Sequence, residues 1–187
     1  DILAATSTNE LSSQAVPELP TTIEIDRRAL IIYTSGTTGA PKGVVTTHRN
    51  LQAQITSLVD AWRWSANDVI MNVLPLHHVH GVVNVVACAL WSGATCEMTE
   101  KFDADVVWNR VRECVDNKSK RDPLTLFMAV PTIYAKLVNA WENMSDDERR
   151  ESTNAFKTLR LAVSGSAALP QTLFERWQHV GGHTLLE

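Results

Sequence analysis

The chain has 187 residues, of which 44% are hydrophobic and 20% charged, so it is long enough to bury the core of one ordinary globular domain. Its 17 basic and 21 acidic residues give a formal net charge of -4, which argues against a nucleic-acid-binding protein or one that contacts membranes through basic patches. The apolar runs are too short to span a bilayer, and the three cysteines form no C-x-x-C pair that would indicate a zinc ribbon. We therefore expect small molecules as partners, and the composition leaves the oligomeric state open.

The N-terminal region differs in composition from the rest of the chain. Thr6–Thr22 is rich in Ser, Thr and Pro, so residues 1–25 are expected to form a polar linker or a truncated N-terminal segment. Residues 26–187 are expected to form part of one domain, and the sequence stops at His183–Glu187, where an apolar strand is expected to begin.

From Ala29 onward, short apolar runs alternate with segments of helical periodicity, which predicts an α/β fold. Ala29–Tyr33 is expected to be a buried strand, and Val44–Thr46 a second strand after a loop of glycine and hydroxyl residues. The helix that follows should have one apolar face, made of Leu51, Ile55, Leu58, Val59 and Trp62.

The same alternation continues to the end of the chain. The expected strands are Val69–Leu74, Ala94–Met98, Leu124–Ala129 and Leu159–Val163. Four more helices are expected. The first is largely buried, covers Val82–Trp91 and stops near Gly93, and the second is capped by Asp103 and reaches about Val115. The third has Pro131 in its first turn, and the fourth runs from Pro170 to Gly181. Ser145 and Glu148 have capping-box spacing, so the acidic run between them is expected to open a solvated helix and not to bind a metal.

The most specific motif is YTSGTTGAPKG, at Tyr33–Gly43. Its glycines allow a close approach of the backbone, its hydroxyl groups add donors, and Lys42 supplies a mobile positive charge, so the loop can wrap a polyphosphate. In the common P-loop a glycine comes directly before the lysine, whereas here Pro41 precedes Lys42. A plain surface turn is the alternative interpretation.

This motif resembles the phosphate-binding signature of the adenylate-forming superfamily, which includes acyl-CoA synthetases, firefly luciferase and peptide-synthetase adenylation domains. The resemblance implies the large N-terminal domain of that fold. It also implies that a carboxylate attacks the α-phosphate of ATP to give an acyl-adenylate, which the thiol of CoA captures. Mg²⁺, bound through ATP, would offset the phosphate charge. The implied phosphate-binding residues are Thr34, Ser35, Gly36, Thr37, Thr38, Gly39, Ala40, Pro41, Lys42 and Gly43.

Other segments extend the resemblance over most of Ala29–Glu187. PLHHVHG at Pro75–Gly81 is similar to a segment that lines the acyl pocket, and VSGSAALP at Val163–Pro170 to a loop that borders adenine and substrate. With AVPTIYAKL and GHTLLE, they look most like the malonyl-CoA synthetases, which would accept malonate or methylmalonate. The implied adenine and acyl-pocket residues are His78, His80, Gly165, Ser166, Ala167 and Lys136.

The histidine cluster of His77, His78 and His80 has two other interpretations. Closely spaced imidazoles can bind zinc, but no cysteine or carboxylate lies nearby at ligand spacing. One histidine could also simply pack inside the domain.

The same resemblance implies that residues needed for catalysis lie beyond Glu187, including a small C-terminal domain that carries a lysine. No catalytic residue is therefore assigned within the chain, and we expect the isolated polypeptide to have no measurable ligase activity. A ligase for another acid, such as a fatty acid, and a non-catalytic nucleotide-binding protein are the alternatives. The resemblance is compatible with a mitochondrial matrix or a bacterial cytoplasmic setting.

Overall fold

The computed structural model describes residues 22–34, 39–113 and 121–187. Four parallel strands form its central sheet, in the order β4-β3-β5-β6. The strands are β3 (Val69–Asn72), β4 (Thr95–Met98), β5 (Leu126–Ala129) and β6 (Leu161–Ser164). All residues of β3 and β5 are buried, as expected for central strands covered on both faces.

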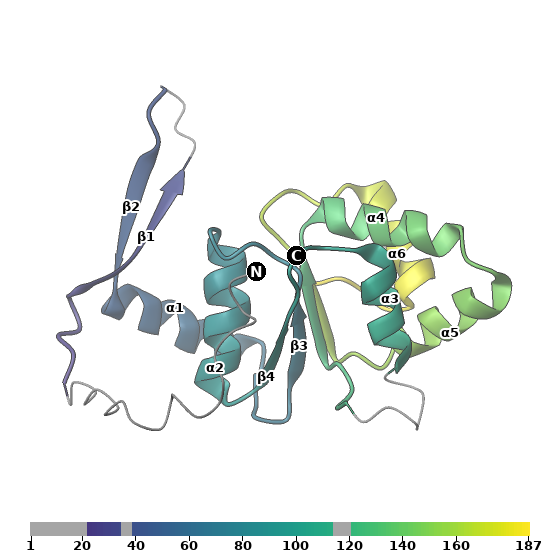
Figure 1. Ribbon diagram of the computed structural model, residues 1–187, viewed down its shortest axis with the longest axis horizontal. Helices are drawn as coiled ribbons and strands as arrows, with labels where there is room; N and C mark the ends of the chain where they lie inside the picture. The colour runs from purple at the N-terminus through teal and green to yellow at the C-terminus, as the bar shows by residue number, and fades with distance from the viewer. Residues whose placement is uncertain (1–21, 35–38, 114–120) are drawn as a thin grey trace, which may run out of the picture.

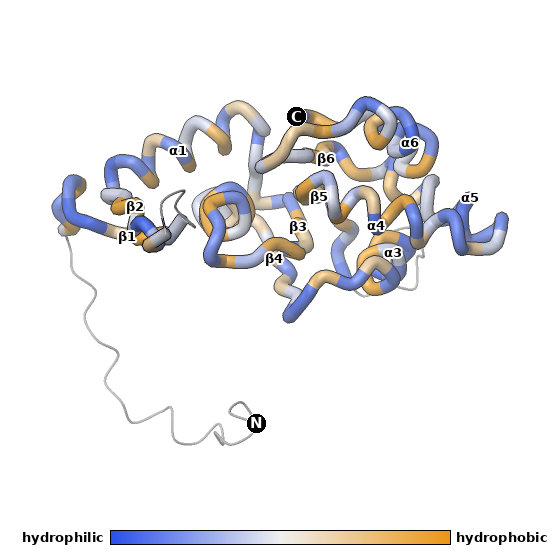
Figure 2. Tube along the Cα trace, turned by 90° about the horizontal axis from the view of Figure 1, so that it is seen from above, coloured by the Kyte–Doolittle hydropathy of each residue, from blue (hydrophilic) through white to orange (hydrophobic). Residues whose placement is uncertain are grey.

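Helices cover the two faces of this sheet (Figure 1). One face carries α1 (His48–Ala61), the π-helix η1 (His80–Ala87) and α2 (Cys88–Ser92). The other carries α3 (Ala104–Glu113), α4 (Pro131–Glu142), α5 (Asp146–Phe156) and α6 (Gln171–Gly181). In Figure 2 the strands are mostly hydrophobic and α5 mostly hydrophilic, which agrees with a core centred on the sheet. The predicted α/β class is confirmed.

A separate antiparallel hairpin precedes the parallel sheet. It pairs β1 (Arg28–Thr34) with β2 (Lys42–Thr47), and Figure 1 shows it standing apart from the central sheet. The prediction that Ala29–Tyr33 is buried was wrong, because Ile31 is 51% and Tyr33 68% exposed. An apolar run predicts a strand, but burial also needs a covering layer, and among the described strands β1 pairs only with β2.

The predicted helix Val82–Trp91 is two helical segments. The first is η1, whose wider turns begin at His80, two residues before the predicted start. The second, α2, ends at Gly93, which has the left-handed φ of 72° that favours glycine at a helix end. Leu90 and Trp91 are exposed, so the segment is buried only in its first part.

Several predicted helix ends are confirmed. Asp103 Oδ1 accepts hydrogen bonds from the N–H groups of Asp105 and Val106, and Ser145 with Glu148 forms the capping box at the start of α5. The extent of α3 toward Val115 lies outside the described residues. Instead of a full strand after His183, a single parallel bridge joins Leu186 to Val163. Within the described ranges, no helix is long and apolar enough to cross a membrane.

Candidate functional site

A cavity of about 750 Å³ lies where the carboxyl ends of the central strands meet the last residues of β1. Parallel strands present their carboxyl ends at one edge of a sheet, which is where ligands of α/β proteins commonly bind. Leu74 follows β3, Val130 follows β5 and Ser166 follows β6, so three connections converge there. The lining residues are Ile32, Tyr33, Thr34, Leu74, Pro75, His78, Val79, His80, Gly81, Val130, Ile133 and Ser166.

The hairpin brings the first two residues of the phosphate-loop motif, Tyr33 and Thr34, to this cavity. Thr34 lines the cavity and is paired in register with Lys42, whose carbonyl oxygen accepts a hydrogen bond from Thr34 Oγ1 at 3.4 Å. Lys42 is exposed, and among the described residues it makes no ion pair. Gly39 has a φ of 109°, a conformation that favours glycine. Lys42 is not among the residues that line the cavity, but it is the cross-strand partner of one that is, and an exposed ammonium group can follow the oxygens of a phosphate.

The remaining residues of this motif divide into two groups. Ala40, Pro41 and Gly43 are exposed and are not among the residues that line the cavity. The predicted phosphate-binding residues Ser35, Gly36, Thr37 and Thr38 lie outside the described residues.

His80 and Ser166 are the closest polar pair in the cavity. His80 Nδ1 lies 3.1 Å from Ser166 Oγ, within hydrogen-bonding distance, although the two residues are 86 positions apart in the sequence. Burial lowers the pKa of His80 below its ordinary value, which favours the neutral imidazole. The neutral ring can donate through one nitrogen and accept through the other.

Backbone geometry holds this pair in place. Ser166 has a φ of 68°, which is uncommon for a residue with a side chain. A Cβ atom on Gly165 would lie 3.2 Å from His80 Cε1, so the absence of a side chain there lets the imidazole approach the loop. The predicted Ala167 is exposed and is not among the residues that line the cavity.

The histidine segment contributes unequally to the cavity. His78 is exposed and lines the cavity, whereas His77 contacts the His78 ring with 4.4 Å between ring centroids and is not part of the lining. Among the described residues, no group of three or more His, Cys, Asp or Glu side chains comes together in a way that could hold a metal ion.

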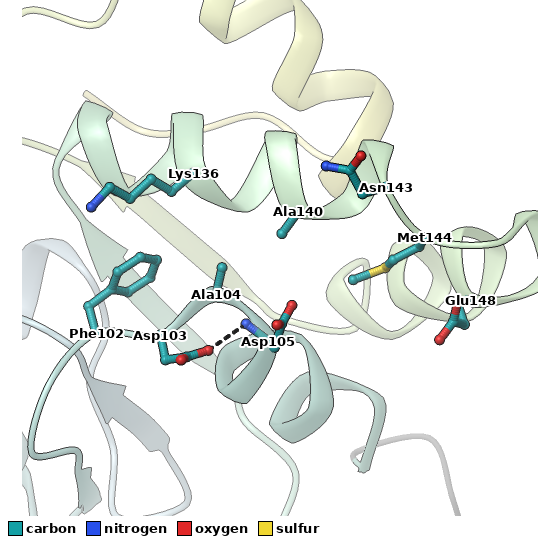
Figure 3. Close-up of a pocket in the computed structure, with 9 residues that line it drawn as sticks. All are labelled: Phe102, Asp103, Ala104, Asp105, Lys136, Ala140, Asn143, Met144 and Glu148. Carbon is teal, nitrogen blue, oxygen red and sulfur yellow. Dashed lines mark hydrogen bonds between the residues drawn. The ribbon is translucent and has the colours of Figure 1, made fainter.

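Lys136 does not join the cavity of His80 and Ser166. It lines a second hollow of about 620 Å³ between α3, α4 and the start of α5, shown in Figure 3. There its Nζ atom lies 5.8 Å from the centre of the Phe102 ring. Sequence spacing placed Lys136 on the correct helix but did not fix which cavity its side chain would reach. This geometry gives no support to Lys136 as an acyl-pocket residue.

Sequence reasoning did not single out several apolar lining residues, among them Val130 and Ile133. One signal could have found them: Val130 directly follows the buried strand β5, and Ile133 lies in the first turn of the next helix. Both positions are expected near the carboxyl edge of a parallel sheet.

Comparison with known proteins places the chain in a family. The AMP-binding enzyme family model matches residues 2–187. The mitochondrial malonate–CoA ligase of Mus musculus is 51% identical over 165 residues, which cover 87% of this chain and 27% of that protein. The malonate–CoA ligase of Arabidopsis thaliana is 41% identical, again over 87% of this chain and 27% of that protein. The chain thus spans about a quarter of the length of the curated relatives it matches.

Solved structures give the same assignment. ATP-bound MatB from Rhodopseudomonas palustris is similar with a TM-score of 0.71 and 32% identity, covering 87% of this chain and 29% of that one. A malonyl-CoA ligase complex with methylmalonyl-CoA and AMP has a TM-score of 0.76 and 35% identity, covering 92% of this chain and 34% of that one. The fold, the cavity at the strand ends and the match over almost the whole sequence lead to one conclusion: the chain belongs to the AMP-binding enzyme family.

Proposed function

We propose that the native protein is an AMP-forming carboxylate–CoA ligase that uses malonate or methylmalonate. The observation that carries this proposal is that one cavity joins Thr34, at the start of the phosphate-loop motif, with His80 and Ser166 from two distant segments. A site for this reaction must hold a nucleotide phosphate and an acid side by side.

The proposed reaction has two steps. A carboxylate oxygen attacks the α-phosphorus of ATP, the bond to the β-phosphate oxygen breaks, and pyrophosphate leaves with formation of the acyl-adenylate. The sulfur of CoA then attacks the acyl carbonyl carbon, the thiol proton is lost, and AMP leaves. In the first step Lys42 would hold the phosphate oxygens of ATP, because Lys42 is exposed and is the cross-strand partner of the cavity-lining Thr34.

The choice of acid rests on the polar groups of the cavity and on the relatives. No carboxylate is among the described residues that line the cavity, so they would not repel a dianionic substrate. Neutral His80 and the Ser166 hydroxyl can hydrogen-bond the second carboxylate of malonate, which must not be buried without partners. Relatives at 51% and 41% identity carry the name malonate–CoA ligase, which supports the same acid.

Mg²⁺ has no ligand set among the described residues of this cavity. Mg²⁺ in proteins is commonly held by one or two carboxylates together with substrate phosphates, and the described lining offers no carboxylate. No step of the proposed reaction is therefore assigned to the ion. The proposal also places the protein in mitochondria, since the Mus musculus relative is a mitochondrial protein.

The test is a coupled assay of the native protein with ATP, CoA and one acid at a time, in which pyrophosphate release and acyl-CoA formation are both measured. We expect acyl-CoA formation with malonate or methylmalonate at a kcat/KM well above that for octanoate. A higher kcat/KM for octanoate would overturn the choice of acid. The absence of pyrophosphate release with every acid would overturn the ligase proposal.

A further inference from the structure

Tyr134 is a fully buried residue of α4 whose hydroxyl group has a specific partner. Tyr134 Oη donates a hydrogen bond to the carbonyl oxygen of Val163 at 2.9 Å, across the interface between α4 and β6. Its ring packs edge-on against Trp177, with 4.6 Å between ring centroids, and against Phe127 at 6.0 Å. Burial raises the pKa of Tyr134 well above its ordinary value, so the hydroxyl stays a donor at any physiological pH.

The acceptor of this hydrogen bond lies immediately before the loop of the candidate site. Val163 and Ser164 end β6, and the chain then turns through Gly165 to Ser166. The backbone N–H groups of Ser164 and Gly165 donate to Leu186 and Ala129, at 2.8 and 3.1 Å. Tyr134 thus adds a side-chain anchor three residues before Ser166.

The same helical turn also forms part of the cavity wall. Ile133 lines the cavity, and the next residue, Tyr134, points into the core toward β6. Ser166 is held at a positive φ with its Oγ 3.1 Å from His80 Nδ1, so a small movement of the end of β6 would be passed on to this contact. A hydrogen bond that couples the wall to the loop can set the position of the Ser166 hydroxyl.

We propose that Tyr134 is a positioning residue, which acts through the Val163 carbonyl to hold Ser166 in the geometry required by the carboxylate substrate. This inference rests on the proposed ligase function and adds a residue that does not itself touch the substrate. A phenylalanine ring would fill the same space in the core. The inference therefore assigns the Tyr134 hydroxyl group a role beyond core packing.

A double-mutant cycle separates positioning from a general loss of stability. Tyr134→Phe, Ser166→Ala and the double variant would be made in the native protein, and kcat/KM for malonate measured at saturating ATP. Thr153→Val is the matched control, because it also removes a hydroxyl that donates to a backbone carbonyl, that of Val180 at 2.7 Å, between α5 and α6. Melting temperatures of all four variants would be recorded.

We expect Tyr134→Phe to lower kcat/KM about fivefold to tenfold, the effect of one net hydrogen bond, and to have less than about a twofold effect once Ser166 is alanine. Thr153→Val should lower the melting temperature to a similar extent and change kcat/KM by less than about twofold. Equal effects of Tyr134→Phe in both backgrounds, or an effect no larger than that of Thr153→Val, would overturn the inference while leaving the ligase function in place. A lack of acyl-CoA formation by the unsubstituted protein would overturn the ligase proposal, and this inference with it.

Discussion

Gly81, in the first turn of η1, is the position where one added methyl group should have the largest effect on the candidate site. A Cβ atom there would lie 2.4 Å from the carbonyl oxygen of Pro75 and 3.2 Å from that of Leu74. Because Cβ atoms essentially never come within 3.0 Å of another heavy atom, Gly81→Ala requires a backbone shift of at least 0.6 Å. Both crowded atoms belong to the backbone, so no side chain can rotate away to relieve the contact.

The shift would reach His80, the neighbour of Gly81 in the chain. A displacement of this size can lengthen the contact between His80 Nδ1 and Ser166 Oγ from 3.1 Å to at most about 3.7 Å, which is too long for a hydrogen bond. Overpacking of this kind costs about 1–3 kcal/mol of stability. A misplacement approaching 1 Å at a reacting centre lowers activity by about tenfold to a hundredfold.

The assay compares Gly81→Ala with Gly93→Ala in the native protein. Gly93, directly after α2, is a matched control because its φ of 72° strains any residue with a side chain, and it is not among the residues that line the cavity. Denaturant unfolding should show comparable losses of stability, while kcat/KM for the carboxylate should fall strongly only in Gly81→Ala. If both variants keep kcat/KM within about twofold of each other, the argument that Gly81 positions His80 is refuted.

Three further predictions address other parts of the chain. Lys136→Ala should leave kcat/KM for malonate unchanged, because Lys136 lines a separate cavity. A fall in kcat/KM of about tenfold would show that Lys136 does contact the acid and would contradict this prediction. Asp68→Asn should cost about 2 kcal/mol in urea unfolding, because it breaks the 2.6 Å ion pair between buried Asp68 and partly exposed Arg160. Burial alone would raise the pKa of Asp68, but hydrogen bonds from Arg160 and Thr125 outweigh it and lower the pKa below its ordinary value of 3.8. The stability that ionised Asp68 adds to the fold is therefore present above pH 3.8 and is lost as the pH falls through the lowered pKa. Unfolding at a series of acidic pH values should show that loss in the unsubstituted protein and a weaker one in Asp68→Asn. Ser145→Ala removes the N-cap of α5, which should cost about 1 kcal/mol of stability without changing acyl-CoA formation.

Local signals predicted most of the fold. The apolar face of α1 is confirmed by buried Ile55 and by the packing of its partly buried neighbours against the core, and the ends of α2 and α5 follow from Gly93 and Ser145. These features depend on residues a few positions apart, so the composition and spacing of the sequence are enough to predict them. Burial of β1 depends on which other element covers it. The residues of β1 alone do not say which element that is.

The candidate site was predictable only in part for the same reason. The motifs indicated Thr34, His80 and Ser166. The parallel strands explain why His80 and Ser166, which follow β3 and β6, meet at one edge of the central sheet, but they do not explain how the separate hairpin brings Thr34 there. The separation of Lys136 from that edge depends on the direction of one side chain on α4. The hydrogen bond from Tyr134 spans 29 residues and joins two elements whose packing no local pattern describes.

The most direct test of the account is calorimetric titration of the native protein with MgATP, comparing Lys42→Ala with Lys101→Ala. Both lysines are exposed, but Lys42 is paired with Thr34, which lines the cavity, whereas Lys101 precedes α3. Loss of a charged hydrogen bond corresponds to about a tenfold to hundredfold increase in Kd, and we predict this for Lys42→Ala alone. Equal affinities of the two variants for MgATP would contradict the claim that this hairpin holds the phosphates of the nucleotide.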